Sequence, residues 1–265
     1  MRIFWSFSRQ AFHNTAIYRF DFWLQLVTVW FMSYSVYWIW NSLYAQNPSS
    51  FEVSLEQMVT YGILGMAFET IFAPGKGPQT YIASQVQTGL IHSDLMKPID
   101  FQVHMLARNF GETFFRFCAL VIPSLVISYV FFDLSIPKHI STIVLFTISI
   151  VFGYLVLFSL NFLIGLLAII TLDIRSIGWA YNALLRFFSG QMVPLWLFPG
   201  VLVGVAEFLP FKSIYYTPLS IYIEKLSGIS ALKAIMFQLI WIIILFFIGR
   251  LIWNRIHLRL TVQGG

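Results

Sequence analysis

The residues of this 265-residue chain that could do chemistry are a few ionisable side chains set in long apolar stretches. An ionised group is costly to place among apolar side chains, so each is a candidate functional residue by default. Glu112 lies one helical turn before Arg116, a spacing that lets the two pair. For Glu69 and Arg186 a structural role is the simpler interpretation, since each could snorkel to the membrane surface or pair with another group. For Glu207 a structural and a functional role are equally open.

No set of residues predicts bond chemistry or a metal centre. The single cysteine, Cys118, sits inside an apolar stretch, so neither a disulfide framework nor a thiol metal site is expected. The five histidines fall in separate segments without a closely spaced His or Cys. An enzyme active site needs a nucleophile beside a base, and the sequence offers no such pair, so we predict no catalytic residues.

The composition indicates a membrane protein. Of the residues, 58% are hydrophobic, 28 are Phe, and only 10% are charged. A soluble core cannot take up so much apolar surface, and about 20 apolar residues in a helix cross the roughly 30 Å hydrocarbon core of a bilayer. We therefore predict an all-α integral membrane protein with six transmembrane helices. The expected spans are Phe22–Leu43, Leu55–Ala73, Gly111–Phe132, Ile140–Leu172, Ile177–Phe198 and Ile229–Leu251.

The distribution of Lys and Arg predicts the orientation of these spans. Cytoplasmic segments are enriched in basic residues, and most of them fall inside only if both termini are cytoplasmic. Glu69 and Arg186 are then expected near the cytoplasmic ends of their spans. The net charge of +5 follows from this asymmetry, so it gives no support to nucleic-acid binding.

Residues 1–20 have an amphipathic pattern. Arg2, Ser6, Arg9 and His13 share one helical face, and apolar side chains share another. This pattern predicts a helix lying in the cytoplasmic interface of the membrane. The alternative is a basic leader that only orients the first span.

The longest cytoplasmic connection covers residues 74–108. It opens with the turn Pro74-Gly75-Lys76-Gly77-Pro78 and continues as two short amphipathic segments separated at Gly89. Such a segment docks either on the lipid surface or on a partner protein, and both possibilities are open.

A second irregular region follows the fifth span, where Pro194, Pro199 and Pro210 interrupt an apolar run. Proline removes a backbone hydrogen bond. In a bilayer the freed carbonyls need partners, so a broken helix must pack in protein or face water. We predict an extracellular re-entrant helical hairpin over residues 199–222, with Glu207 inside it.

The two irregular regions each contain a motif. The first is Gln85-Val86-Gln87-Thr88-Gly89-x-Ile91-x-x-Asp94-Leu95-x-Lys97-Pro98-Ile99-Asp100. The second is Phe187-Phe188-Ser189-Gly190-x-x-Val193-Pro194-Leu195-x-x-Phe198-Pro199, followed by Leu209-Pro210-Phe211 and Tyr216-Thr217-Pro218. Both motifs resemble those of bacterial type-2 ATP-binding-cassette (ABC) exporter permeases, and the resemblance covers essentially the whole chain. It is to a subgroup in which two different permeases accompany one kind of ATPase.

This resemblance implies a type-2 ABC exporter fold in one permease domain, residues 1–265, with a coupling helix that sits in a groove of the ATPase. The implied coupling residues are Gln85, Thr88, Gly89, Asp94, Leu95, Lys97 and Pro98. The implied outer-gate residues are Pro194, Pro199, Glu207 and Pro210.

The resemblance also implies partners and cargo. The chain contains no phosphate-binding loop, so two copies of a separate ATPase would bind ATP and Mg²⁺. A second, homologous permease would complete the pathway in the plasma (inner) membrane of a bacterium. The cargo would be amphipathic or hydrophobic: a drug, a lipid-linked molecule or an antimicrobial peptide.

Two other functions are weighed against the exporter. A membrane-embedded transferase could use Glu69, Glu112 and Asp173 at one depth, although no His pairs with them. An ion-coupled carrier would show an internal repeat with ionisable residues at the membrane midplane, and the sequence shows neither.

Overall fold

The computed structural model describes residues 2–15, 19–46, 51–72, 77–171 and 175–260. Within these ranges the chain forms helices and turns, without a strand, which confirms the all-α prediction. Pro74, Gly75 and Lys76 of the predicted turn, and Asp173, lie outside the described residues.

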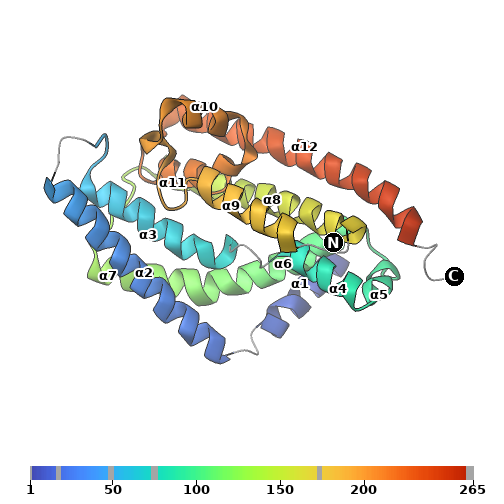
Figure 1. Cartoon of the computed structure of the whole chain (residues 1–265). Helices are drawn as coiled ribbons and strands as arrows, with labels where there is room; N and C mark the ends of the chain where they lie inside the picture. Colours follow the sequence, from blue (N-terminus) through green and yellow to red (C-terminus); the bar gives the residue numbers. More distant parts are fainter. Residues whose placement is uncertain (1, 16–18, 47–50, 73–76, 172–174, 261–265) are drawn as a thin grey trace.

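The long helices run side by side along the molecule (Figure 1). They are α2 (Arg19–Gln46), α3 (Leu55–Phe72), α6 (Phe101–Arg116) with α7 (Ile122–Phe131), α8 (Ile140–Thr171), α9 (Arg175–Phe188) and α12 (Gly228–Leu260). At one end lie both termini with α4 (Pro78–Gln87) and α5 (Ile91–Leu95), and at the other lie α10 (Gly200–Phe208) and α11 (Tyr216–Tyr222).

Within the described ranges, three helices are long and apolar enough to cross a membrane by length and composition. They cover Phe101–Phe131, Ile140–Thr171 and Gly228–His257, and they match the third, fourth and sixth predicted spans. The first two predicted spans are also helical, as α2 and α3. The count of six spans stays a prediction.

The third predicted span begins too late. Its helix starts at Phe101 rather than Gly111 and continues to Phe131 through a π-helical turn at Phe117–Val121. The start is set by Asp100, whose Oδ1 accepts a hydrogen bond from the backbone N–H of Val103 at 3.1 Å. An N-cap of this kind satisfies a donor that the helix cannot satisfy itself.

The fifth predicted span, 177–198, is wrong as a single helix. α9 ends at Phe188 after 14 residues, which is about 21 Å at a rise of roughly 1.5 Å per residue. Gly190 follows with φ +71°, a conformation that glycine adopts readily and that ends helices. α9 is therefore shorter than the hydrocarbon core is thick.

Two hydrophobic clusters hold the bundle together. The larger joins α3, α8, α9, α11 and α12 around Tyr61, Phe72 and Tyr215. The smaller lies at the end that carries the termini, where Phe101 stacks on Trp253 with ring centroids 4.1 Å apart. Ile82 of α4 belongs to the smaller cluster, so the connection between α3 and α6 is packed into the protein.

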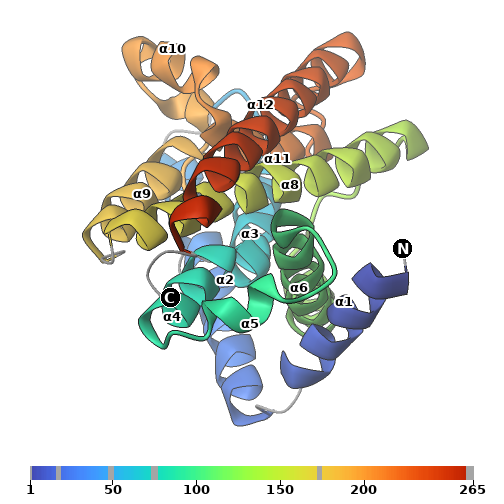
Figure 2. The same ribbon diagram turned by 90° about the vertical axis from the view of Figure 1, so that its right-hand side faces the viewer.

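The N-terminal helix α1 (Arg2–Thr15) lies against α6, as Figure 2 shows from the end that carries the termini. The contact is close because a Cβ at Gly111 would lie 2.0 Å from the carbonyl oxygen of Ser8. Within residues 1–20 the structure has a helix over 2–15, and its position in a membrane interface stays a prediction. Its docking on α6 favours it over a leader that only orients the first span.

Candidate functional site

Asp94 is the centre of a buried polar cluster in the connection between α3 and α6. Its side chain is 2% exposed, and Oδ1 lies 2.6 Å from Nζ of Lys97. Its Oδ2 accepts hydrogen bonds from the hydroxyl of Tyr81 at 2.9 Å and from Nε2 of Gln85 at 3.1 Å. Nε2 of His104, from α6, lies 3.6 Å from Oδ1. One carboxylate thus joins α4, α5 and α6.

The protonation state of the cluster follows from these contacts. Burial by itself would raise the pKa of Asp94, but His104, Lys97, Gln85 and Tyr81 hold the pKa of this carboxyl well below its ordinary value. Burial and the neighbouring carboxylate raise the pKa of Tyr81 to about 12. Asp94 is therefore a carboxylate at neutral pH, and Tyr81 remains a hydrogen-bond donor.

Further contacts tie the cluster to the rest of the bundle. The ring of Phe7, from α1, packs on His104 with centroids 4.5 Å apart, and the guanidinium of Arg108 lies 3.6 Å from the ring centroid of Tyr81. Oδ2 of Asp100 lies 3.1 Å from Nη1 of Arg250 in α12. A displacement of α4 and α5 would therefore be transmitted to α1, α6 and α12.

The structure divides the predicted coupling residues by exposure. Thr88, Gly89 and Pro98 are exposed, Gln85, Leu95 and Lys97 are partly buried, and Asp94 is buried. Asp94 shapes the segment from inside, whereas the exposed tip carries two large apolar side chains, Leu90 (55% exposed) and Met96 (81% exposed). The expected role of all seven residues in coupling stays a prediction.

Glu69 and Arg186 form an ion pair between α3 and α9, with Nη2 3.1 Å from Oε1. The expected position of Arg186 near the cytoplasmic end of its span stays a prediction. α9 ends two residues later, at Phe188, so Arg186 stands at the end of α9 that leads towards α10. Because α9 is short, its far end reaches only to the level of Glu69.

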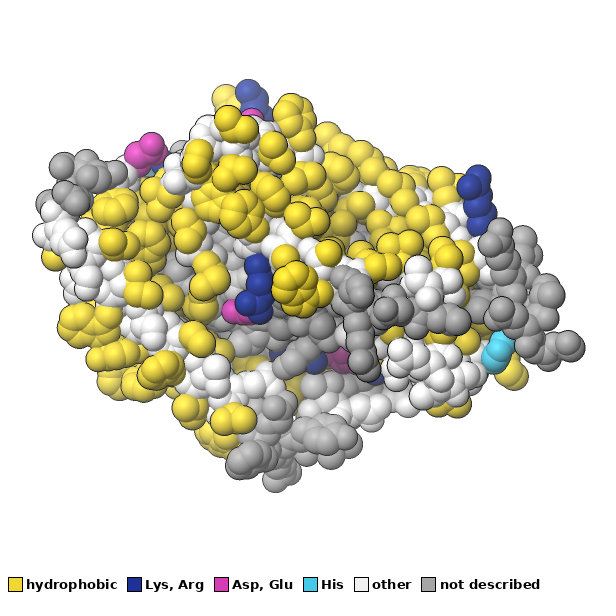
Figure 3. Space-filling view, viewed as in Figure 1, with side chains coloured by type: hydrophobic (Ala, Val, Ile, Leu, Met, Phe, Trp, Pro, Cys, Tyr) yellow, Lys and Arg dark blue, Asp and Glu magenta, His cyan; other side chains and the backbone are white. Residues whose placement is uncertain are grey.

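This ion pair lies in an apolar groove between α2 and α3. The groove is a cavity of about 460 Å³ lined mainly by Leu24, Val29, Met32, Met66, Glu69 and Arg186. Figure 3 shows the surrounding face, which is largely hydrophobic. A charged pair on such a face is costly in contact with lipid, so the face needs water or another protein over the groove.

The pairing expected between Glu112 and Arg116 stays a prediction, and Arg108 is an observed partner of Glu112. Its Oε1 lies 3.0 Å from Nη2 of Arg108, one turn before it in α6. The earlier helix start at Phe101 makes Arg108 available at the i−4 position. Glu69 and Glu112 each form an ion pair with an arginine. These pairs do not favour a transferase that would use the two carboxylates as acid and base.

The break between α9 and α10 is packed in protein, as the freed carbonyls require. The Tyr61 hydroxyl donates to the Gly190 carbonyl, and the Tyr216 N–H donates to the Ser189 carbonyl at 2.9 Å. Pro194 precedes a short 3₁₀ turn, and Pro199 precedes the first residue of α10. Pro210 begins the 3₁₀ turn that leads towards α11. These bounds agree with the predicted hairpin, whose depth in a membrane stays a prediction.

Glu207 is exposed on α10. Lys212, the partner considered for it, lies over the ring of Phe237 at 4.5 Å from the centroid. Among the described residues no ion pair joins Glu207 to a basic group. The charge of Glu207 nevertheless acts on Lys212, so a structural and a functional role for this carboxylate both stay open.

Gln238 is a buried polar residue that the sequence-based candidates do not include. Its Nε2 donates to the carbonyls of Ser213 at 2.7 Å and Ser149 at 3.0 Å, and its Oε1 accepts from the Ser149 hydroxyl at 3.0 Å. It thereby fastens the turn before α11 to α8 and α12. An amide within the apolar run 234–248 is the signal that points to it.

Comparison with known proteins agrees with this architecture. A family model described as ABC-2 family transporter protein matches residues 22–264. No curated protein matches the chain. The family match covers all the long helices together with the connection around Asp94 and the outer break. The chain therefore belongs to the ABC-2 transporter family and is a membrane permease component of an ABC transporter.

Proposed function

We propose that this chain is the permease subunit of an ATP-driven exporter of amphipathic or hydrophobic molecules. The observation that carries the proposal is the tip of the α4–α5 segment. Buried Asp94 holds this segment in one shape, and exposed Leu90 and Met96 leave it with an apolar surface. A rigid apolar tip suits a groove in another protein better than it suits water.

The partner at this tip would be an ATPase that binds ATP and Mg²⁺, in two copies per transporter. Closure of the two ATPase subunits would push α4 and α5. The contacts of Asp94 with His104 and of Asp100 with Arg250 would pass this movement to α6 and α12. The long helices would then tilt as units, because each is a continuous hydrogen-bonded rod.

A second, homologous permease would cover the groove that contains Glu69 and Arg186. The side chains around it on α2 and α9 are apolar and exposed, Val27 and Leu184 among them. Only a protein or a water-filled pathway can surround the ion pair at acceptable cost. Facing grooves from two permeases would form a path with apolar walls and few charges, which suits drugs, lipid-linked molecules or antimicrobial peptides.

In the proposed orientation α4, α5 and both termini lie in the cytoplasm of a bacterium, and α10 and α11 lie at the outer face of its plasma membrane. Cargo would enter the path from the cytoplasm or the inner leaflet. Pro194, Pro199 and Pro210 would shape the outer gate, with Glu207 facing the exit.

The test is the purified complex of this chain with its ATPase. Leu90→Asp and Met96→Asp should each reduce ATPase co-purification and cargo-stimulated ATP hydrolysis by about tenfold, because a carboxylate in an apolar contact is left without a partner. Ile136→Asp is the matched control, since Ile136 is an exposed apolar residue (56%) in the connection between α7 and α8. Full activity in both tip variants would leave the segment a lipid-lying connector.

A further inference from the structure

A second groove lies at the opposite end of the molecule, between the start of α8 and the segment that joins α11 to α12. It is a cavity of about 730 Å³, within the range of small-molecule sites. Figure 2 shows the first turns of α8 and α12 diverging with α11 between them. The groove lies between these diverging turns. None of the predicted coupling or gate residues lines it.

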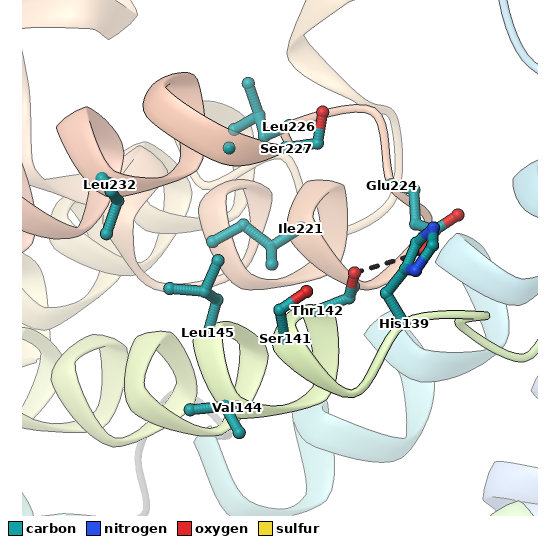
Figure 4. Close-up of a pocket in the computed structure, with 11 residues that line it drawn as sticks. His139, Ser141, Thr142, Val144, Leu145, Ile221, Glu224, Leu226, Ser227 and Leu232 are labelled. Atoms are coloured by element: carbon teal, nitrogen blue, oxygen red, sulfur yellow. Dashed lines mark hydrogen bonds between the residues drawn. The ribbon is translucent and has the colours of Figure 1, made fainter.

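The groove has a polar end and an apolar end (Figure 4). Glu224, His139, Ser141 and Thr142 gather at one end, and Leu145 and Leu232 lie further along it. The helix surfaces beside it are exposed and apolar, which is the arrangement expected where a groove opens sideways to lipid. These flanking residues are Ile140, Ile143, Val144, Ile229, Leu232 and Met236.

Glu224 occupies a backbone position that normally favours glycine. Its φ is +62°, and it directly follows Ile223, the residue that caps the C-terminal end of α11. A non-glycine residue in this conformation is strained, because its Cβ crowds the neighbouring backbone. The side chain is held towards the groove by the hydroxyl of Thr142, which lies 3.2 Å from Oε1.

The carboxylate of Glu224 has capacity for a cationic partner. Among the described residues no ion pair involves Glu224. The adjacent Lys225 is directed elsewhere: its Nζ pairs with Glu52 and lies 4.9 Å from the ring centroid of Trp196. A carboxylate has room for several hydrogen bonds, and Thr142 supplies one.

We propose that this groove binds a glycerophospholipid with an ethanolamine head group. One acyl chain lies against Leu145 and Leu232, and the primary ammonium donates to the carboxylate of Glu224. The lipid phosphate meets the hydroxyls of Ser141 and Ser227. An ammonium with N–H donors fits better than a trimethylammonium, which cannot donate a hydrogen bond to the carboxylate. The site does not depend on the transport activity proposed above.

The test is native mass spectrometry of the full chain, purified in detergent with an equimolar mixture of ethanolamine, choline and glycerol phospholipids of identical acyl chains. We expect one retained lipid per chain, with the ethanolamine lipid preferred about tenfold over the other two, as a charge-assisted hydrogen bond would give. Glu224→Gln should abolish the preference.

Glu224→Gly separates binding from folding, because glycine relieves the positive φ while it removes the carboxylate. This variant should be at least as stable to heat as the natural chain and yet show no head-group preference. Asp133→Asn is the matched control, since it neutralises an exposed carboxylate in the connection between α7 and α8 and should leave the preference unchanged. Leu232→Trp should reduce the retained lipid by filling the groove.

Three results would overturn the proposal. They are an ethanolamine preference that persists in Glu224→Gln and Glu224→Gly, equal retention of all three lipids by the natural chain, and absence of any retained lipid. A preference for the anionic glycerol lipid would also exclude the assignment, since it would mean that the groove selects a negative head group.

Discussion

At the scale of single residues, burial decides what each ionisable group can do. Asp94 and Glu207 are both acidic residues within recognisable motifs, but Asp94 is buried and fully engaged whereas Glu207 is exposed. Asp94 therefore acts by positioning α4 and α5. Glu207 can meet cargo or a partner directly.

Asp94→Asn should destabilise the α4–α5 segment by about 2 kcal/mol, because it removes a carboxylate that accepts charge-assisted hydrogen bonds. In the natural chain, Nζ of Lys97 lies 3.1 Å from Nε2 of His104. The substitution removes the anion that both of these groups face. Limited proteolysis of the purified chain should show earlier cleavage within residues 88–98. Asp133→Asn, an exposed acidic residue, is the control, and equal cleavage of the two variants would contradict a positioning role.

The same variant gives a pH dependence. The pKa of Asp94 is lower in the folded chain than in the unfolded chain, so the stability it contributes is complete above about pH 4. This contribution is lost as pH falls below that value, towards the folded pKa. The difference in thermal stability between the natural chain and Asp94→Asn should be constant from pH 7 to about pH 5 and should narrow below pH 4. A difference that stays constant from pH 5 down to pH 3 would contradict this contribution of Asp94.

At the scale of elements, α1, α4, α5 and α6 behave as one packed body at the end with the termini. Phe7 reaches the Asp94 cluster, and the small residues Gly111 and Gly165 allow close helix contacts. A Cβ at Gly165 would lie 2.7 Å from Cδ1 of Ile82. α1 is thus placed to sense or to limit the movement of α4 and α5.

Gly111→Ala should displace α1, since the added Cβ meets backbone that cannot rotate away. In a Cys118→Ala background, a cysteine at the buried position Ser8 should react slowly with a maleimide in detergent. The reaction should become about tenfold faster when Gly111→Ala is added. Gly204→Ala is the matched control, because a Cβ there meets nothing within 4 Å. An unchanged rate would mean that α1 and α6 separate without cost.

At the scale of the whole molecule, the chain has two structured ends and an ion pair between them. The Asp94 cluster occupies one end, α10 and α11 occupy the other, and Glu69 with Arg186 lies on an apolar face in between. This arrangement suits a subunit that is displaced by an ATPase at the α4–α5 end and opens at the α10–α11 end. A second permease would bind along the face between these ends.

The ion pair predicts a charge-swap experiment. Arg186→Glu should weaken assembly with the second permease, because two carboxylates would face each other in the groove, and transport should fall about tenfold. Adding Glu69→Arg restores an opposite pair and should recover most of the loss. A double variant as poor as the single one would assign each residue an independent role. A stable, active homodimer purified without another membrane subunit would exclude the second permease.

The orientation is tested by labelling intact cells. In a Cys118→Ala background, Ser227→Cys should react with a membrane-impermeant maleimide added outside, and Ser93→Cys should react only after the membrane is opened. Both side chains are exposed, so access to the reagent is the only difference. The reverse pattern would invert the proposed topology.

The sequence by itself determined the protein class and most helices, because apolar runs of span length leave few alternatives. It also placed the outer break at Pro194, Pro199 and Pro210, since proline and glycine act locally. Only the tertiary structure decided the partners of the polar residues: Arg108 for Glu112, Glu69 for Arg186, and the buried setting of Asp94. The hydrogen bonds of Gln238 also join it to backbone that is distant in the sequence. The end of α9 at Phe188 likewise depends on contacts with distant segments. Helical periodicity says which residues share a face, whereas the depth and rotation of one helix against another follow from packing that no local pattern records.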